Sequence, residues 1–128
     1  MHPHEESLIR SFIQPERRLR WLQCLKSSKK RGRMLDRLNH CRDLDSRFAR
    51  SIPSKSNVQE LLTAQNAPQT CYVVSANDEI DGREMELSDA IEQAKLSGWG
   101  TLIGCIPNRL AYYYDECGER QMILDRDQ

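Results

Sequence analysis

The sequence lacks any apolar run close to the ~20 residues that a membrane-spanning helix requires. Its first residues, MHPHEES, are polar where a secretory signal would be basic and then apolar. These absences argue against a membrane or secreted protein. We therefore expect a soluble cytoplasmic protein without a membrane partner, and its 128 residues predict one domain covering residues 1–128.

Cysteine is present in an odd number, and no two cysteines have the C-x-x-C spacing of a redox or zinc motif. An odd count without paired spacing is typical of the reduced thiols of an intracellular protein. Disulfides and a zinc site are therefore not predicted for Cys24, Cys41, Cys71, Cys105 and Cys117.

Motifs that identify a reaction are absent as well, including the P-loop, H-E-x-x-H and G-x-S-x-G patterns. The segment Asn77–Gly82 follows the first half of a calcium-binding loop, but Ser88 stands where the twelfth position requires a bidentate glutamate. The sequence therefore predicts no catalytic residue, no metal site and no cofactor. It indicates a binding protein, with an enzyme of unrecognised type left open.

Charge is present in an unusual arrangement. The net charge is zero, but residues 1–55 hold 14 lysines and arginines against 6 acidic residues, whereas residues 56–128 hold 5 against 13. The two parts therefore carry +8 and −8. Such asymmetry bears on partners rather than on fold, and it predicts two surfaces of opposite charge.

The positive charge is concentrated between residues 17 and 33. A helix capped by Ser27 or Ser28 would place three cations in its first turn, where the helix dipole favours acids, and an external anion would relieve this arrangement. The alternative is a solvated loop between helices, which is the usual setting of a charged run. The predicted basic patch is Arg17, Arg18, Arg20, Lys29, Lys30, Arg31 and Arg33. The predicted acidic patch is Asp78, Glu79, Asp81, Glu84 and Glu86.

Strand-type patterning is concentrated in Trp99–Leu124, which we expect to form the core. Apolar, β-branched and aromatic residues alternate in three segments, 101–106, 110–114 and 122–124. An earlier strand is predicted at Thr70–Ser75. It is followed by Asp81-Gly82, the strongest signal for a two-residue hairpin turn.

Helical spacing of apolar residues predicts about three helices in the basic part. The second of them begins at Pro15 and carries Leu19, Leu22 and Leu25 on one face. Ser51–Ser56 is predicted to be a linker, and two further helices follow it: a brief one capped by Ser56 and a longer one at 88–96 that ends at Gly98.

The predicted fold class is therefore α+β. A basic N-terminal bundle of about three helices, residues 1–50, is followed by an acidic region, residues 57–128, with an antiparallel sheet of four to five strands and one helix packed on it. Each region is small for independent stability, so we expect one shared core with Trp21 and Trp99 near the contact.

The function we expect is that of a small interaction or regulatory protein that acts through charge-complementary surfaces, with a protein partner or by self-association. The alternative is a nucleic-acid-binding protein that uses the basic helical region Arg17–Arg33. The alternative requires a helix that reaches bases from a short turn, and the sequence does not identify one.

Overall fold

The computed structural model describes residues 1–40, 42–116 and 120–127. This part of the chain contains five α-helices: α1 (Pro3–Phe12), α2 (Arg18–Leu25), α3 (Arg31–Leu35), α4 (Val58–Ala64) and α5 (Leu87–Ser97). Its strands are β1 (Ala49–Ile52), β2 (Thr70–Ser75), β3 (Arg83–Glu86), β4 (Thr101–Ile106), β5 (Leu110–Tyr114) and β6 (Gln121–Asp125). Short 3-10 helices lie at Pro15–Arg17, Asp36–His40 and Ser46–Phe48. Within these ranges no helix is long and apolar enough to cross a membrane.

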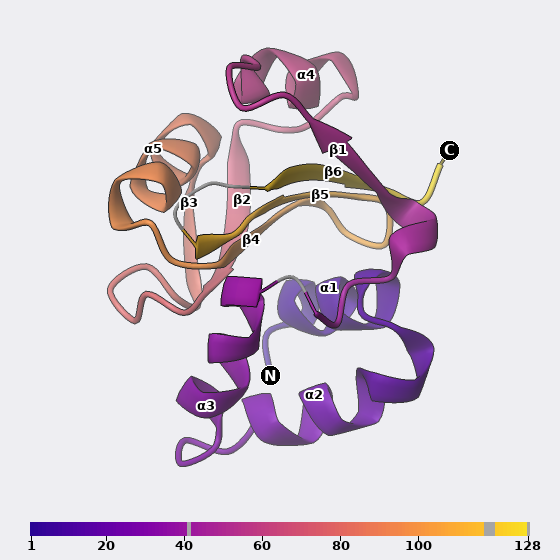
Figure 1. The fold of residues 1–128 in the computed structure, drawn as a ribbon, viewed down its shortest axis with the longest axis vertical. Helices are drawn as coiled ribbons and strands as arrows, with labels where there is room; N and C mark the ends of the chain where they lie inside the picture. The colour runs from indigo at the N-terminus through magenta and orange to yellow at the C-terminus, as the bar shows by residue number, and fades with distance from the viewer. Residues whose placement is uncertain (41, 117–119, 128) are drawn as a thin grey trace.

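The strands form one antiparallel sheet in the order β1-β6-β5-β4-β2-β3 (Figure 1). The predicted α+β class is confirmed, with one strand more than the four to five expected. The additional strand is β1, which overlaps the predicted linker Ser51–Ser56. Its four residues carry little strand signal of their own, and the strand forms because β6 pairs with it, with Ala49 opposite Leu124. It ends before Pro53, which has no amide hydrogen for the ladder.

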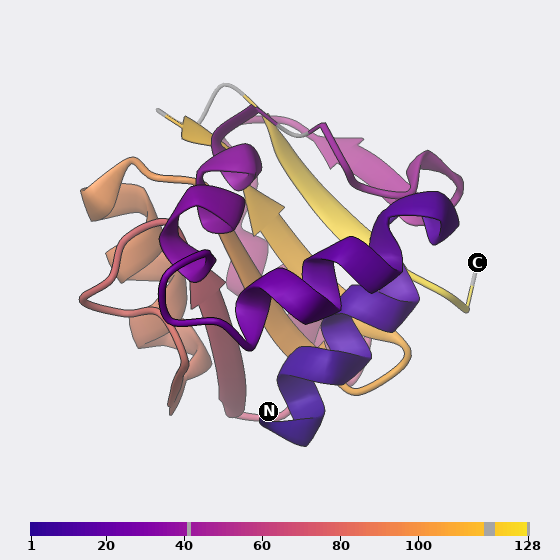
Figure 2. The same ribbon diagram turned by 90° about the horizontal axis from the view of Figure 1, so that it is seen from below.

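Helices cover both faces of the sheet (Figures 1 and 2). The N-terminal helices α1, α2 and α3 lie on one face, and α4 and α5 lie on the other. The prediction of one helix on the sheet was therefore too low, since α4 also contributes Val58 and Leu62 to the buried core. With both faces covered, the central strands β4 and β5 are buried along nearly their whole length.

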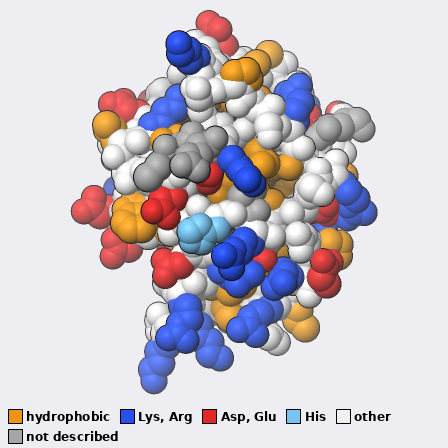
Figure 3. All heavy atoms as spheres, viewed as in Figure 1, with side chains coloured by type: hydrophobic (Ala, Val, Ile, Leu, Met, Phe, Trp, Pro, Cys, Tyr) orange, Lys and Arg blue, Asp and Glu red, His pale blue; other side chains and the backbone are white. Residues whose placement is uncertain are grey.

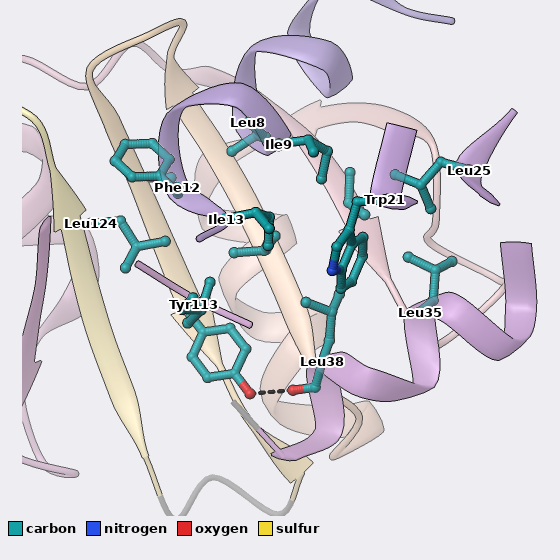
Figure 4. Packing of buried hydrophobic residues seen from close by; sticks show 14 of the residues in the cluster. Leu8, Ile9, Phe12, Ile13, Trp21, Leu25, Leu35, Leu38, Tyr113 and Leu124 are labelled. Carbon is teal, nitrogen blue, oxygen red and sulfur yellow. Dashed lines mark hydrogen bonds between the residues drawn. The ribbon is translucent and has the colours of Figure 1, made fainter. Parts of the chain in front are cut away.

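Two buried clusters result from the alternation of side chains along each strand. In β2, Tyr72 and Val74 face the N-terminal helices, whereas Cys71 and Val73 face α4 and α5. In the first cluster the indole of Trp21 lies above Leu38, and the Tyr113 hydroxyl donates a hydrogen bond to the Leu38 carbonyl (Figure 4). Helices of the basic region and strands of the acidic region thus share one core.

The two tryptophans, which we expect near the contact between the regions, differ in burial. Trp21 is fully buried, whereas Trp99 is 47% exposed after the end of α5, next to Gly100, whose amide donates a hydrogen bond to the Asn39 side chain. The predicted apolar face of α2 was wrong in one residue, because Leu19 is 68% exposed while Trp21, Leu22 and Leu25 are buried. At about 100° per residue, Leu19 is about 160° from Trp21 around the helix, so burial of the large indole turns Leu19 toward water.

The turn at Asp81-Gly82 is not a two-residue hairpin. Gly82 has the positive φ of 74° that the prediction required, but β2 continues past its pairing with β3. Its last residues, Val74 and Ser75, pair with β4 instead. A longer loop, residues 76–82, therefore connects the two strands.

The structure also corrects the predicted helix caps and locates the thiols. Asn57, not Ser56, caps α4 by accepting a hydrogen bond from the Glu60 amide. No side chain caps α5, whereas Gly98 ends it in the left-handed conformation, as predicted. Cys24, Cys71 and Cys105 are free thiols, while Cys41 and Cys117 lie outside the described residues.

A cationic groove between α2 and α3

The chain reverses direction tightly between α2 and α3. The Ser27 carbonyl accepts hydrogen bonds from the Lys30 and Arg31 amides at 3.1 and 2.9 Å. The predicted third helix is present but short, because α3 has five residues and passes directly into the 3-10 helix Asp36–His40. The Ser27 hydroxyl, a predicted cap, accepts a hydrogen bond from the Lys30 amide at 3.3 Å, whereas Lys30, which directly precedes α3, forms no side-chain cap, and no acid lies in the first turn. The reversal packs α3 against α2 as the outermost layer on this side of the molecule (Figure 2).

A groove of about 350 Å³ lies between the two helices. Its apolar lining comes from the buried Met34 and the half-buried Cys24. Polar and cationic side chains complete the lining: Arg20, Gln23, Lys30, Arg33 and Arg37. The groove thus combines an apolar surface with four positive charges, which come from α2, the turn, α3 and the 3-10 helix that follows α3.

Arg37 is held in place by Asp43. Its Nε and Nη2 donate to the two Asp43 carboxylate oxygens at 2.5 and 2.9 Å. Asp43 is buried and also accepts a hydrogen bond from the Trp21 indole at 3.0 Å. Burial acts to raise the pKa of Asp43, but the hydrogen bonds from Arg37 and Trp21 and the charges of Arg37 and Arg17 lower it below its ordinary value. The carboxylate therefore stays ionised and fixes Arg37 at the edge of the groove.

Three arginines of the predicted basic patch are paired within the protein. Arg17 lies 3.3 Å from Asp43, and Arg18 lies 3.6 Å from Asp45 while donating to the Ile13 carbonyl at 2.8 Å. Arg31 is paired most completely, since each of its five N–H groups has an acceptor. The five hydrogen bonds go to both oxygens of Glu5, both oxygens of Asp81 and the Leu25 carbonyl.

These hydrogen bonds hold Arg31 within the protein and give it a structural role. Its hydrogen bonds to Glu5 and Asp81 raise the pKa of the Arg31 guanidinium above its ordinary value, more than burial lowers it. The Glu5 side chain is only 4% exposed and also accepts a hydrogen bond from the Tyr72 hydroxyl. With no N–H group free, Arg31 has no donor left for an external anion.

The remaining four cations of the predicted patch are exposed, and within the described ranges they form no ion pair: Arg20, Lys29, Lys30 and Arg33. Lysine and arginine side chains gather over the α2 and α3 end of the molecule, at the bottom of Figure 3, with apolar side chains among them. The structure thus divides the predicted patch into three paired arginines and four unpaired cations.

The predicted acidic patch lies on the loop 76–82 and on the edge strand β3. Asp81 is occupied by Arg31 and accepts a hydrogen bond from the Ser75 amide, and Glu84 contacts His2 at 2.9 Å. Asp78, Glu79 and Glu86 are exposed and form no ion pair with the rest of the described chain.

Four residues of the groove were missed from the sequence: Gln23, Cys24, Met34 and Arg37. Helical spacing offered a signal, because Arg20 and Cys24, and Arg33 and Arg37, are each four residues apart and so share a helix face. No cluster of histidine, cysteine or acidic side chains suited to a metal ion occurs among the residues that the structure describes. Comparisons with protein-family models, curated protein sequences and solved structures found no match.

Proposed function

We propose that this protein is an interaction protein that binds an acidic segment of a protein partner in the cationic groove. One observation carries the proposal: Arg20, Lys30 and Arg33, which lack an ion pair in the described part of the chain, converge on a groove lined by Cys24 and Met34. The exposed cations would steer an acidic partner, which increases the association rate more than the affinity.

The apolar lining supports a protein ligand. An exposed ion pair contributes only about 0–1 kcal/mol, since water solvates both charges before they meet. A side chain that enters the groove would bury apolar surface against Met34 and Cys24, and would also exclude water from the neighbouring charges. Charge and apolar contact together fit a partner segment that carries both.

Nucleic-acid binding by the same cations is the second candidate, favoured by the exposed Lys29 and Lys30 at the turn between the helices. The geometry supports it less well. A helix that reads the major groove presents several side chains along its length, and α3 has five residues. Bases of a single strand stack on exposed aromatic rings, but Tyr112, Tyr113 and Tyr114 are buried.

A triple variant tests the proposal: Arg20→Gln, Lys30→Gln and Arg33→Gln. We expect it to lose at least about tenfold in affinity for a fluorescent peptide of glutamate and leucine residues, measured by anisotropy. The matched control, Arg50→Gln, Lys55→Gln and Lys95→Gln, removes three exposed cations elsewhere and should bind as the wild type does. Equal losses in both variants, or an absence of peptide binding by the wild type, would contradict the proposal. Preferential binding of DNA or RNA with a steep salt dependence would favour the second candidate.

A further inference from the structure

We infer that β3 binds an extended basic segment of a partner protein, which adds to the sheet as a further strand antiparallel to β3. This inference goes beyond the proposed function, because it concerns the acidic surface of the molecule and a different partner from that of the groove. It follows from the position of β3 in the sheet, from the direction of its backbone groups and from the charges around it.

The strand β3 lies at one edge of the sheet, with β2 on its inner side and no strand of the described chain on its outer side. It lies beside α5 (Figure 1), and its residues Arg83, Glu84 and Glu86 are exposed. An edge strand presents N–H and C=O groups with which another chain can pair. The outer side of β3 therefore offers the backbone contacts that an added strand uses.

The backbone groups of Glu84 and Glu86 point outward. The Leu87 amide, directly after β3, donates to the Gln69 carbonyl at 2.6 Å, and this pair continues the register of β2 and β3. Because backbone direction alternates along a strand, Met85 faces β2 as Leu87 does, whereas Glu84 and Glu86 face away from it. Glu86 precedes α5 as its N-cap, so its carbonyl is used by the helix. The Glu84 N–H, the Glu84 C=O and the Glu86 N–H remain for a partner.

The charges around this edge favour a basic segment. Asp78, Glu79 and Glu86 are exposed and form no ion pair within the described ranges. Arg83 donates to the Glu79 carbonyl at 3.2 Å, so the acidic loop lies next to the start of β3. A second copy of the chain fits poorly, since pairing of two β3 strands would place Glu84 opposite another glutamate, and like charges in that position are destabilising.

The register of β3 defines the pattern of the segment. A residue directly opposite Glu84 has its side chain on the same face of the sheet, so a lysine there would meet that carboxylate. A second lysine, two residues away, would meet Glu86. The residue between them lies on the other face beside Met85, which is half-buried against the core. Cations that alternate with apolar β-branched residues therefore match β3.

Short fluorescent peptides test this pattern by anisotropy. The first alternates lysine and valine, the second groups the same residues into a lysine block and a valine block, and the third has glutamate in place of lysine. We expect the first to bind at least about tenfold more tightly than the other two, because it alone places a cation opposite both Glu84 and Glu86. Equal binding of the first two peptides would overturn the inference.

N-methylation of the first peptide tests the backbone contact. In an antiparallel pair, the residue opposite Glu84 exchanges two backbone hydrogen bonds with it, and in this peptide that residue is a lysine. Methyl groups on the lysine amides should therefore weaken binding at least about tenfold, whereas methyl groups on the valine amides, which face away from β3, should have little effect. Loss on valine methylation alone, or loss on neither, would overturn the antiparallel strand.

Two substitutions of Glu86 separate its charge from its amide. Its φ of −65° matches that of proline, so Glu86→Pro removes the outward N–H without strain and should leave the unfolding midpoint unchanged. Glu86→Gln removes the charge alone. We expect Glu86→Gln to weaken binding of the first peptide about twofold and Glu86→Pro to weaken it at least about tenfold. Equal effects of the two substitutions would contradict strand addition.

Further outcomes separate this inference from the proposed function and from self-association. The triple variant of Arg20, Lys30 and Arg33 should bind the lysine–valine peptide no more weakly than the wild type does, and a loss of binding there would overturn the assignment to β3. A wild type that binds none of these peptides would also overturn it, while the proposed function would stand. Self-association in sedimentation that Glu86→Pro abolishes would show that a second copy, not a basic partner, occupies β3.

Discussion

Arg31 and Asp81 are 50 positions apart and belong to oppositely charged parts of the chain, yet the guanidinium Nε lies 2.8 Å from the Asp81 carboxylate. The same guanidinium holds Glu5 of α1 at 2.6 Å. Arg31 therefore joins α1, α3 and the loop 76–82 in one network. The positive and negative parts of the chain neutralise each other at this point within one molecule.

The first prediction concerns this network. Arg31→Gln should lower the free energy of unfolding by about 3 kcal/mol, because loss of the guanidinium leaves the buried Glu5 carboxylate without its partner. Lys30→Gln should change it by less than about 0.5 kcal/mol, since Lys30 is exposed. Urea denaturation monitored by tryptophan fluorescence measures both. Similar midpoints for the two variants would show that Arg31 has no special structural role.

The second prediction concerns the shared core. Deletion of residues 1–55 removes β1 and every helix on one face of the sheet, and so exposes Tyr72, Val74 and Leu102. The fragment should be insoluble or should bind a hydrophobic dye in the manner of a molten globule. A soluble fragment that unfolds cooperatively would contradict it.

The third prediction concerns pH. The Nε2 atom of His4 is buried without a hydrogen-bond partner. Burial and the neighbouring His2 lower the pKa of His4, and Glu84 opposes them. The unfolded chain therefore binds a proton at His4 more readily than the folded protein does. Stability should be fully present above the ordinary histidine pKa of 6.5 and should decrease as the pH falls below it, with a slope of at most about one proton.

His4→Gln tests this expectation, because glutamine does not titrate. Unfolding midpoints measured between about pH 5 and pH 7 should depend less on pH in the variant than in the wild type. Tyr72, which stacks on both His2 and His4, should remain neutral throughout, since burial raises its pKa to about 12. An unchanged pH slope in His4→Gln would rule out His4 as its source.

Elements with a strong local signal could be predicted from the sequence. The strands β4 and β5 have alternating apolar residues, and α5 has Gly98 at its end. All three elements were therefore predicted close to their observed bounds. The strand β1 could not be found, because its pairing with β6 joins segments about 70 residues apart and its own residues favour no structure. Leu19 is exposed because the Trp21 indole is buried instead. Helical spacing alone does not show which of these two apolar side chains faces the core.

The site was predictable only in part, for a similar reason. Charge clustering located Arg20, Lys30 and Arg33 correctly as cations near one another, but it treated Arg31 as one of them. Sequence proximity cannot tell which cation meets a distant acid, since the partner of Arg31 comes from a loop 50 residues away. Arg37 was omitted because it lies beyond the basic run, although α3 and the following 3-10 helix return it to the groove.

The last prediction compares two glycines, Gly100 in crowded surroundings and Gly32 in open ones. A methyl group at Gly100 would overlap the Leu38 carbonyl group and approach the Asn39 amide within 2.6 Å, and these backbone atoms cannot move aside as a flexible side chain would. The Gly100 amide also donates to the Asn39 side chain at 2.7 Å, so separation of the segments would break this hydrogen bond. Gly100→Ala should therefore destabilise the protein by about 2–3 kcal/mol, as overpacking does in other cores.

Gly32 provides the matched control for that change. It lies in α3, has an ordinary backbone conformation, and a methyl group there would meet no atom within 4 Å. Gly32→Ala should stabilise the protein by about 0.5–1 kcal/mol, because alanine loses less backbone entropy in a helix. The two substitutions add the same methyl group, so chemical denaturation of the pair isolates the effect of the surroundings. Equal shifts, or a stabilised Gly100→Ala, would mean that the segment 36–40 does not pack on the start of β4 as closely as described.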